Sequence, residues 1–116
     1  MKYEKVPDFR DLNLELLNDL EPEKVVMPLL SVVMYGGNYD LAVNITKQFV
    51  KHPHENLRGV AIECISHIAR LWGIVPQDLI EELNSAFNDP SEWVQGKADF
   101  AADDLEVFIK DYQRPE

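Results

Sequence analysis

The 116-residue chain is acidic, because 21 Asp and Glu residues outnumber 11 Lys and Arg residues and give a net charge of −10. A polyanion of this size is repelled by nucleic acid and by anionic lipid, so we expect neither nucleic acid nor a membrane as a partner. No apolar run approaches the roughly 18 residues of a membrane-spanning helix. A single cysteine, Cys64, excludes an intrachain disulfide and fits a reducing compartment. We therefore expect one cytoplasmic domain over residues 1–116.

Helical periodicity of the apolar residues dominates the chain, and no segment alternates as a strand would. Prolines, glycines and N-cap residues mark the ends of the expected helices. We predict an all-α protein of about six helices in antiparallel pairs. They cover about 8–20, 22–35, 38–52, 54–72, 76–88 and 91–111. Pro28 falls inside the second helix and should kink it.

Two of these helices carry long apolar stripes at the i, i+3, i+4, i+7 spacing of one helix face. In the helix over 54–72 the stripe is Leu57, Val60, Ala61, Cys64, Ile65, Ile68, Leu71 and Trp72. In the helix over 91–111 it is Val94, Ala98, Ala101, Ala102, Leu105, Phe108, Ile109 and Tyr112. Both helices should therefore pack into the core, and the Cys64 thiol should be buried and inert.

The chain also repeats itself. A shift of 37 residues gives the pairs Pro53/Pro90, Glu55/Glu92, Leu57/Val94, Gly59/Gly96, Ala61/Ala98, Cys64/Ala101 and Ile68/Leu105. A shift of 38 relates the preceding helices, for example Asp40 to Asp78. A period near 40 built from two antiparallel helices is typical of HEAT-type solenoids. We predict repeats over 38–73 and 74–111, a capping helix pair over 1–37 and a tail over 112–116.

The last repeat resembles a HEAT repeat in its inner helix. Asp89-Pro90 followed by Val94, Ala98 and Ala101 is similar to the Asp-Pro, Val and Ala positions of that family, and His52-Pro53 begins a weaker copy. The Arg that usually follows the Val is kept as Arg58, whereas Gln95 replaces it in the last repeat. The resemblance covers about 38–111. It implies a short HEAT-like α-solenoid and says little about function.

A narrower resemblance concerns small bacterial HEAT-like proteins. It rests on the strings Leu57-Arg58-Gly59-Val60-Ala61, His67-Ile68-Ala69-Arg70 and Asp103-Asp104-Leu105. Ser66 stands where a glycine is expected, and Trp72 where a polar residue is common. Some proteins of this group are immunity proteins against secreted toxins or toxins delivered by contact-dependent growth inhibition. The resemblance implies a stoichiometric toxin inhibitor.

Residue patterns for catalysis or metal binding are missing from the sequence. His52 and His54 flank a proline with no cysteine or acid at ligand spacing, and Cys64 lies in an apolar stripe. Adjacent acids such as Asp103 and Asp104 diverge by about 100° on a helix and cannot converge on one substrate atom. We therefore expect a protein without enzymatic activity, cofactor, metal or small-molecule substrate.

An apolar flank on the last helix has two interpretations. Trp93, Phe100 and Val107 recur every seven residues, about a third of a turn from the core stripe. They could form an exposed ridge that binds a partner. Alternatively they pack against Ile62 and Ala69 of the neighbouring repeat, which is the interpretation we favour because solenoid helices bury two sides.

The polar faces of the two inner helices form the candidate binding surface, and we expect them to be exposed. Its residues are Glu63, Ser66, His67 and Arg70 on one helix and Asp99, Asp103 and Glu106 on the other. We expect the three acids of the last helix to repel one another and to add nothing to stability. A merely solvated face would carry the same residues.

The charge is uneven along the chain. Nine acids and seven bases give −2 over residues 1–58, and twelve acids and four bases give −8 over 59–116. The acidity could serve solubility alone. Our leading hypothesis is an immunity protein that binds a basic toxin domain, for example a nuclease, whose Lys and Arg residues hold phosphate. The alternative is a general cytoplasmic adaptor that joins two proteins.

Overall fold

A computed structural model describes residues 21–115, and every regular element within them is a helix. The all-helical prediction is therefore confirmed for this part of the chain. The helices are α2 (Pro22–Tyr35), α3 (Tyr39–Phe49), α4 (Glu55–Trp72), α5 (Gln77–Ala86) and α6 (Glu92–Phe108). The helix expected over 8–20 lies outside the described residues.

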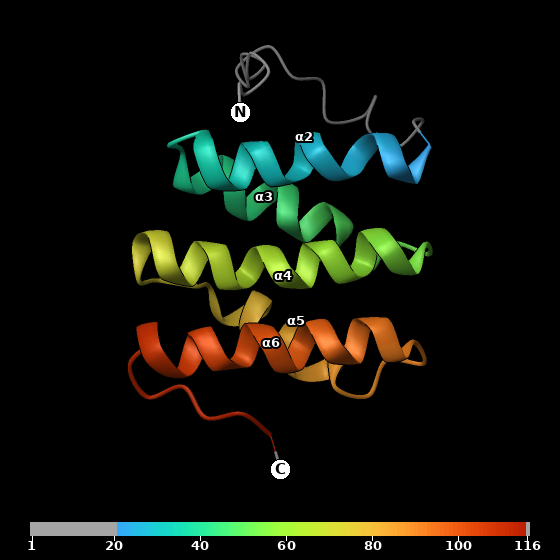
Figure 1. Ribbon diagram of the computed structural model, residues 1–116. Coiled ribbons are helices and arrows are strands. Elements are labelled where there is room, and N and C mark those ends of the chain that lie inside the picture. The colour runs from blue at the N-terminus through green and yellow to red at the C-terminus, as the bar shows by residue number, and fades with distance from the viewer. Residues whose placement is uncertain (1–20, 116) are drawn as a thin grey trace, which may run out of the picture.

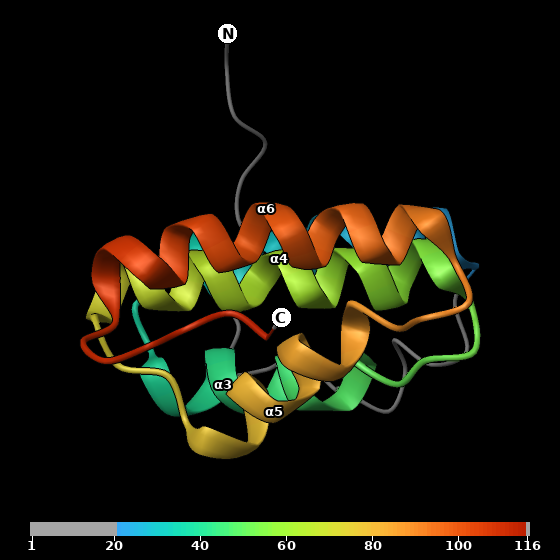
Figure 2. The same cartoon turned by 90° about the horizontal axis from the view of Figure 1, so that it is seen from below.

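The helices form two layers. Figure 1 shows α2, α4 and α6 side by side in one layer, and Figure 2 shows α3 and α5 in a second layer beneath α4 and α6. α4 lies at the centre, because it contacts α2, α3, α5 and α6, and its contact with α6 is the most extensive of any helix pair. The core therefore surrounds α4, and α6 forms the edge of its layer.

Local capping residues explain where the helices begin and end. The Asn38 side chain accepts a hydrogen bond from the Leu41 amide at 3.0 Å, and Ser91 Oγ accepts one from the Val94 amide at 3.3 Å. Gly73 closes α4 with a φ of 69°, the left-handed conformation that glycine adopts without strain. All three residues lie at ends of the helices that the sequence predicts over 38–52, 54–72 and 91–111.

The C-terminal end of α6 differs from the prediction. The helix ends at Phe108 instead of Asp111, because Ile109 takes an extended conformation with φ −110° and ψ 114°. The chain then turns back, and the Tyr112 hydroxyl donates a hydrogen bond to Asn84 Oδ1 of α5 at 2.9 Å. Figure 1 shows the C-terminal segment running back along α6. This turn brings Arg114 alongside the last helix.

The predicted apolar stripes are largely buried, and α4 is buried beyond its stripe. Cys64 is fully buried, and burial raises the pKa of its thiol. Leu71 and Phe108 are the exceptions, with 46% and 41% of their surface exposed. α4 also buries residues outside the stripe, namely Ile62, Ser66, His67 and Ala69. This extra burial follows from its central position, since neighbours cover it from several sides.

Candidate protein-binding surface

The outward side of α6 carries an exposed apolar ridge. Trp93, Phe100 and Val107 have 46%, 60% and 73% of their surface exposed. The favoured interpretation that this flank packs between repeats is therefore wrong for Phe100 and Val107. The side of α6 that enters the core carries Ala98, Ala101 and Leu105, about a third of a turn away. The alternative of an exposed ridge agrees with the structure.

Trp93 differs from the other two residues of the ridge, because its ring lies against α4. A Cβ atom added to Gly59 would come within 2.5 Å of the indole Nε1, so only glycine leaves room for the ring. Lys97 Nζ lies 4.6 Å from the centre of the same ring, at cation–π distance, and 2.6 Å from Glu63 Oε1. Trp93 and Lys97 therefore fasten the outer face of α6 to α4.

Glu63 is the centre of a polar chain along α4. His67 Nε2 lies 3.1 Å from Glu63 Oε2, and Arg70 Nη2 lies 2.9 Å from His67 Nδ1. A guanidinium can only donate, so Nδ1 must accept and Nε2 must carry the proton that is donated to Glu63. The hydrogen bond from His67, together with Lys97, lowers the pKa of Glu63 to about 2 against the opposing effect of burial.

Two of the predicted binding residues are not on the surface. Ser66 is fully buried, with its hydroxyl donating to the Glu63 carbonyl at 2.7 Å, and only 8% of the surface of His67 is exposed. The prediction that both face solvent is wrong, because α4 is covered on more sides than one apolar stripe indicates. Glu63 is half-buried and Arg70 is exposed. A partner can therefore reach Arg70 and part of Glu63 on this helix.

The low pKa of Glu63 predicts a pH-dependent contribution to stability. A carboxylate whose folded pKa lies below its ordinary value of 4.5 stabilises the fold above that value and loses the effect as the pH falls toward about 2. We expect Glu63→Gln to lower the free energy of unfolding by about 1–2 kcal/mol at neutral pH, allowing for partial exposure. Urea unfolding between pH 7 and pH 2.5 should show the difference shrinking. Glu92→Gln, at an exposed acid without an ion pair among the described residues, is the control. A difference that stays constant with pH would contradict this account.

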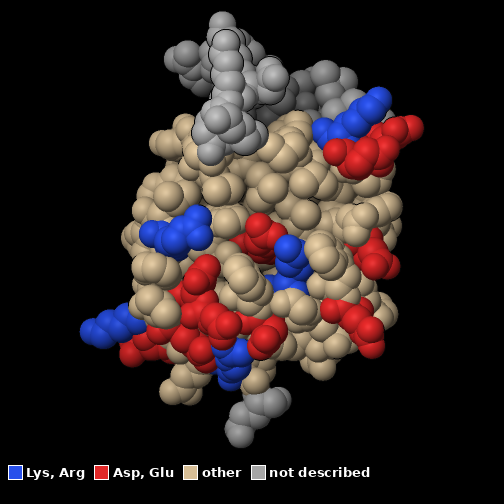
Figure 3. All heavy atoms as spheres, in the orientation of Figure 1, with Lys and Arg blue, Asp and Glu red and all other residues tan. Residues whose placement is uncertain are grey.

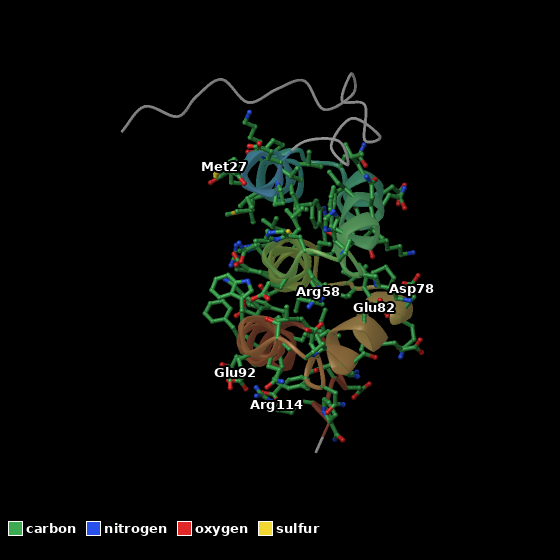
Figure 4. All side chains as sticks on the ribbon, turned by 90° about the vertical axis from the view of Figure 1, so that its right-hand side faces the viewer. Met27, Arg58, Asp78, Glu82, Glu92 and Arg114 are labelled. Atoms are coloured by element: carbon green, nitrogen blue, oxygen red, sulfur yellow. The ribbon has the colours of Figure 1, made fainter. Side chains whose placement is uncertain are left out.

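The acidic row of α6, defined as Asp99, Asp103 and Glu106, binds Arg114 of the C-terminal segment. The guanidinium donates to Asp99 Oδ1 at 2.7 Å and to both Glu106 oxygens at 2.8 Å, and it also contacts Asp103. Figure 4 places Arg114 beside α6. These bonds lower the pKa of Glu106. The expectation of uncompensated repulsion is therefore wrong, although three carboxylates around one guanidinium remain net negative. Figure 3 shows acidic side chains gathered over α6.

The 37-residue shift seen in the sequence pairs the acidic row with residues of α4. The shift of 37 residues relates Asp99, Asp103 and Glu106 to the α4 residues Ile62, Ser66 and Ala69. All three α4 residues are buried, whereas the acids that correspond to them are exposed. The repeat alignment contains this substitution pattern, so the sequence could have marked α6 as an edge helix. The role of Arg114 has no such local signal.

A surface groove lies between the ridge and α4. It has a volume of about 410 Å³ and is lined by Glu63, Glu92, Trp93, Gly96, Lys97 and Phe100. Gly96 forms an open notch in it, because a Cβ atom added there would meet nothing within 4 Å. Among residues 21–115, no cluster of three or more His, Cys, Asp or Glu side chains could hold a metal ion. The groove therefore offers aromatic faces, the Glu92 carboxylate and the ion pair of Lys97 with Glu63.

No protein-family model, curated protein or solved structure matches the chain. Within the described part of the chain, no helix combines the length and the apolar composition that a bilayer crossing requires.

Proposed function

We propose that the chain is a HEAT-like repeat protein that binds a basic protein through the outward face of α6. Support for the repeat comes from the layers, because α4 and α6 lie in one layer and α3 and α5 in the other (Figure 2). The observation that carries the binding role is the exposed ridge Trp93, Phe100 and Val107 next to the acidic row. Large exposed aromatic residues are typical of interaction sites.

Charge indicates the kind of partner. Two of the cations near the ridge are already engaged, since Lys97 pairs with Glu63 and Arg114 pairs with the acidic row. Glu92 has no ion-pair partner among the described residues, and the chain as a whole carries −10. An approaching basic surface therefore meets a negative potential, which accelerates association and gives specificity.

Within this proposal the partner is a toxin domain, and the chain is its immunity protein. The resemblance to small HEAT-like immunity proteins supports this assignment. Domains that attack nucleic acid need Lys and Arg residues to hold phosphate, so their active surface complements an acidic inhibitor. Such an inhibitor acts by occupying the surface, and we assign no catalytic step to the chain.

Replacing one ridge residue tests the proposal. The tagged chain is cross-linked in a lysate of its own organism, and the captured protein is identified, produced alone and assayed for toxicity. We expect a basic protein that kills cells unless this chain is co-produced. Phe100→Ala should weaken its capture at least about tenfold, because aromatic anchors dominate interfaces. It should cost less than about 1 kcal/mol of stability, since 60% of Phe100 is exposed.

Ile74→Ala is the matched control, because Ile74 is equally apolar and 64% exposed but lies in the loop after α4. It should leave capture and protection unchanged. A captured protein that is not toxic would favour an adaptor over an immunity protein. If both variants lose capture to the same extent, the partner does not bind specifically through the outward face of α6, and that part of the proposal is wrong.

A further inference from the structure

The contact between α4 and α6 shows how a glycine on one helix can accommodate an aromatic ring of the next helix. Gly59 of α4 is covered by the Trp93 ring, and the close approach would be impossible with a Cβ atom at residue 59. Lys97, one turn after Trp93, lies over the same ring and pairs with Glu63 of α4 at 2.6 Å. An aromatic ring and a cation from one helix thus dock on a glycine and a carboxylate of the next.

Gly96 is the equivalent glycine of α6 and has no ring on it. The shift of 37 residues takes Gly59 to Gly96 and Glu55 to Glu92. No atom lies within 4 Å of the Cβ position at Gly96, so the notch is open. Phe100 follows one turn later with most of its ring exposed. The last helix therefore repeats the glycine of the α4 site without an aromatic ring on it. The shift takes Glu63 to Phe100, so the carboxylate next to Gly96 is instead Glu92, which lines the same groove.

We propose that the Gly96 notch binds an aromatic side chain of the partner, and that a Lys or Arg next to that side chain pairs with Glu92. This inference rests on the proposed function and names the contact at its centre. The partner ring would lie on Gly96 against Phe100, as Trp93 lies on Gly59. The groove already contains the groups that such a partner would contact. Trp93 and Phe100 supply aromatic rings, and Glu92 supplies a carboxylate for the cation.

Charge repulsion opposes a second copy of this chain as the occupant of the notch. Each copy carries −10, and the acidic row lies beside the notch, so two copies would bring like charges together. A basic segment with an aromatic residue meets no such repulsion. Its cation neutralises Glu92, and its ring covers the exposed face of Phe100. Aromatic rings also attract cations at their faces.

Short peptides test the notch without the natural partner. The probe is the capped peptide Lys-Lys-Phe-Lys-Lys, titrated into the ¹⁵N-labelled full chain. We expect it to shift the backbone amide signal of Gly96 and the indole N–H signal of Trp93. The other indole, Trp72, packs edge-on against Tyr39 and should not respond. Lys-Lys-Ala-Lys-Lys and Glu-Glu-Phe-Glu-Glu should each bind at least about tenfold more weakly.

Gly96→Ala should weaken binding of the Phe peptide at least about tenfold, because the new methyl group would occupy the position of the edge of the peptide's Phe ring. The fold should not suffer, since the site is open and alanine favours helices more than glycine does. Ser85→Ala, on the exposed side of α5, is the control and should bind normally. The proposal that the notch binds an aromatic side chain is overturned if the Ala peptide binds as tightly as the Phe peptide, or if Gly96→Ala binds the Phe peptide as tightly as the wild type does.

The notch and the proposed function can fail separately. If Phe100→Ala abolishes capture of the basic partner while Gly96→Ala captures it as well as the wild type does, the proposed function stands and the notch is overturned. If the Phe peptide binds at Gly96 but a captured partner is acidic, the notch stands and the proposed function fails.

Discussion

Replacing Arg58 with alanine is expected to lower the free energy of unfolding by about 3 kcal/mol. Arg58 holds Asp89 with two parallel hydrogen bonds, Nε to Oδ2 at 2.7 Å and Nη2 to Oδ1 at 2.8 Å. Its Nη1 also donates to the His52 carbonyl at 3.0 Å. The two charged side chains are only 17% and 11% exposed, so removal of Arg58 leaves a shielded carboxylate unpaired. Urea unfolding measures the loss.

The Arg58 ion pair also connects α4 to the start of α6, because Asp89 accepts a hydrogen bond from the Ser91 amide there. The matched control is Lys47→Ala. Lys47 pairs with Asp78 at 2.7 Å, but these side chains are 41% and 58% exposed. An exposed pair contributes less than about 1 kcal/mol. Similar losses for the two variants would show that burial does not set the strength of these ion pairs.

The local structure was predictable because it depends on neighbouring residues. Asn38, Gly73 and Ser91 act within one turn of their helix ends, so the sequence alone places the caps. The end of α6 was not predictable in the same way. It depends on Tyr112 reaching Asn84 and on Arg114 reaching the acidic row, contacts between residues that are far apart in the chain.

The exposure of the binding surface was only partly predictable. A helical pattern identifies one buried face, but α4 has helices on several sides, and Ser66 and His67 are buried for that reason. Trp93 and Phe100 follow the same spacing, yet only Trp93 finds a glycine on the neighbouring helix. The spacing gives both residues the same prediction, and the three-dimensional neighbour decides between packing and exposure.

Ile62→Asp should have a larger effect than Arg58→Ala and should lower the free energy of unfolding by at least about 4 kcal/mol. Only 1% of Ile62 is exposed, so the new carboxylate would be buried between helices. Arg58, one turn earlier on α4, is already held by Asp89, so pairing with it would break that contact. Small domains are stable by about 5–15 kcal/mol, and the variant should therefore unfold at much lower urea concentrations.

The reverse substitution at the equivalent position of α6 provides the control. Asp99 corresponds to Ile62 in the repeat, but its side chain is 67% exposed and shares Arg114 with two other acids. Asp99→Ile should change the free energy of unfolding by less than about 1 kcal/mol, because the lost ion pair is at the surface. Circular dichroism during urea unfolding compares the two variants. Comparable losses would mean that α6 is not the edge of its layer and that its acidic row is buried in the native protein.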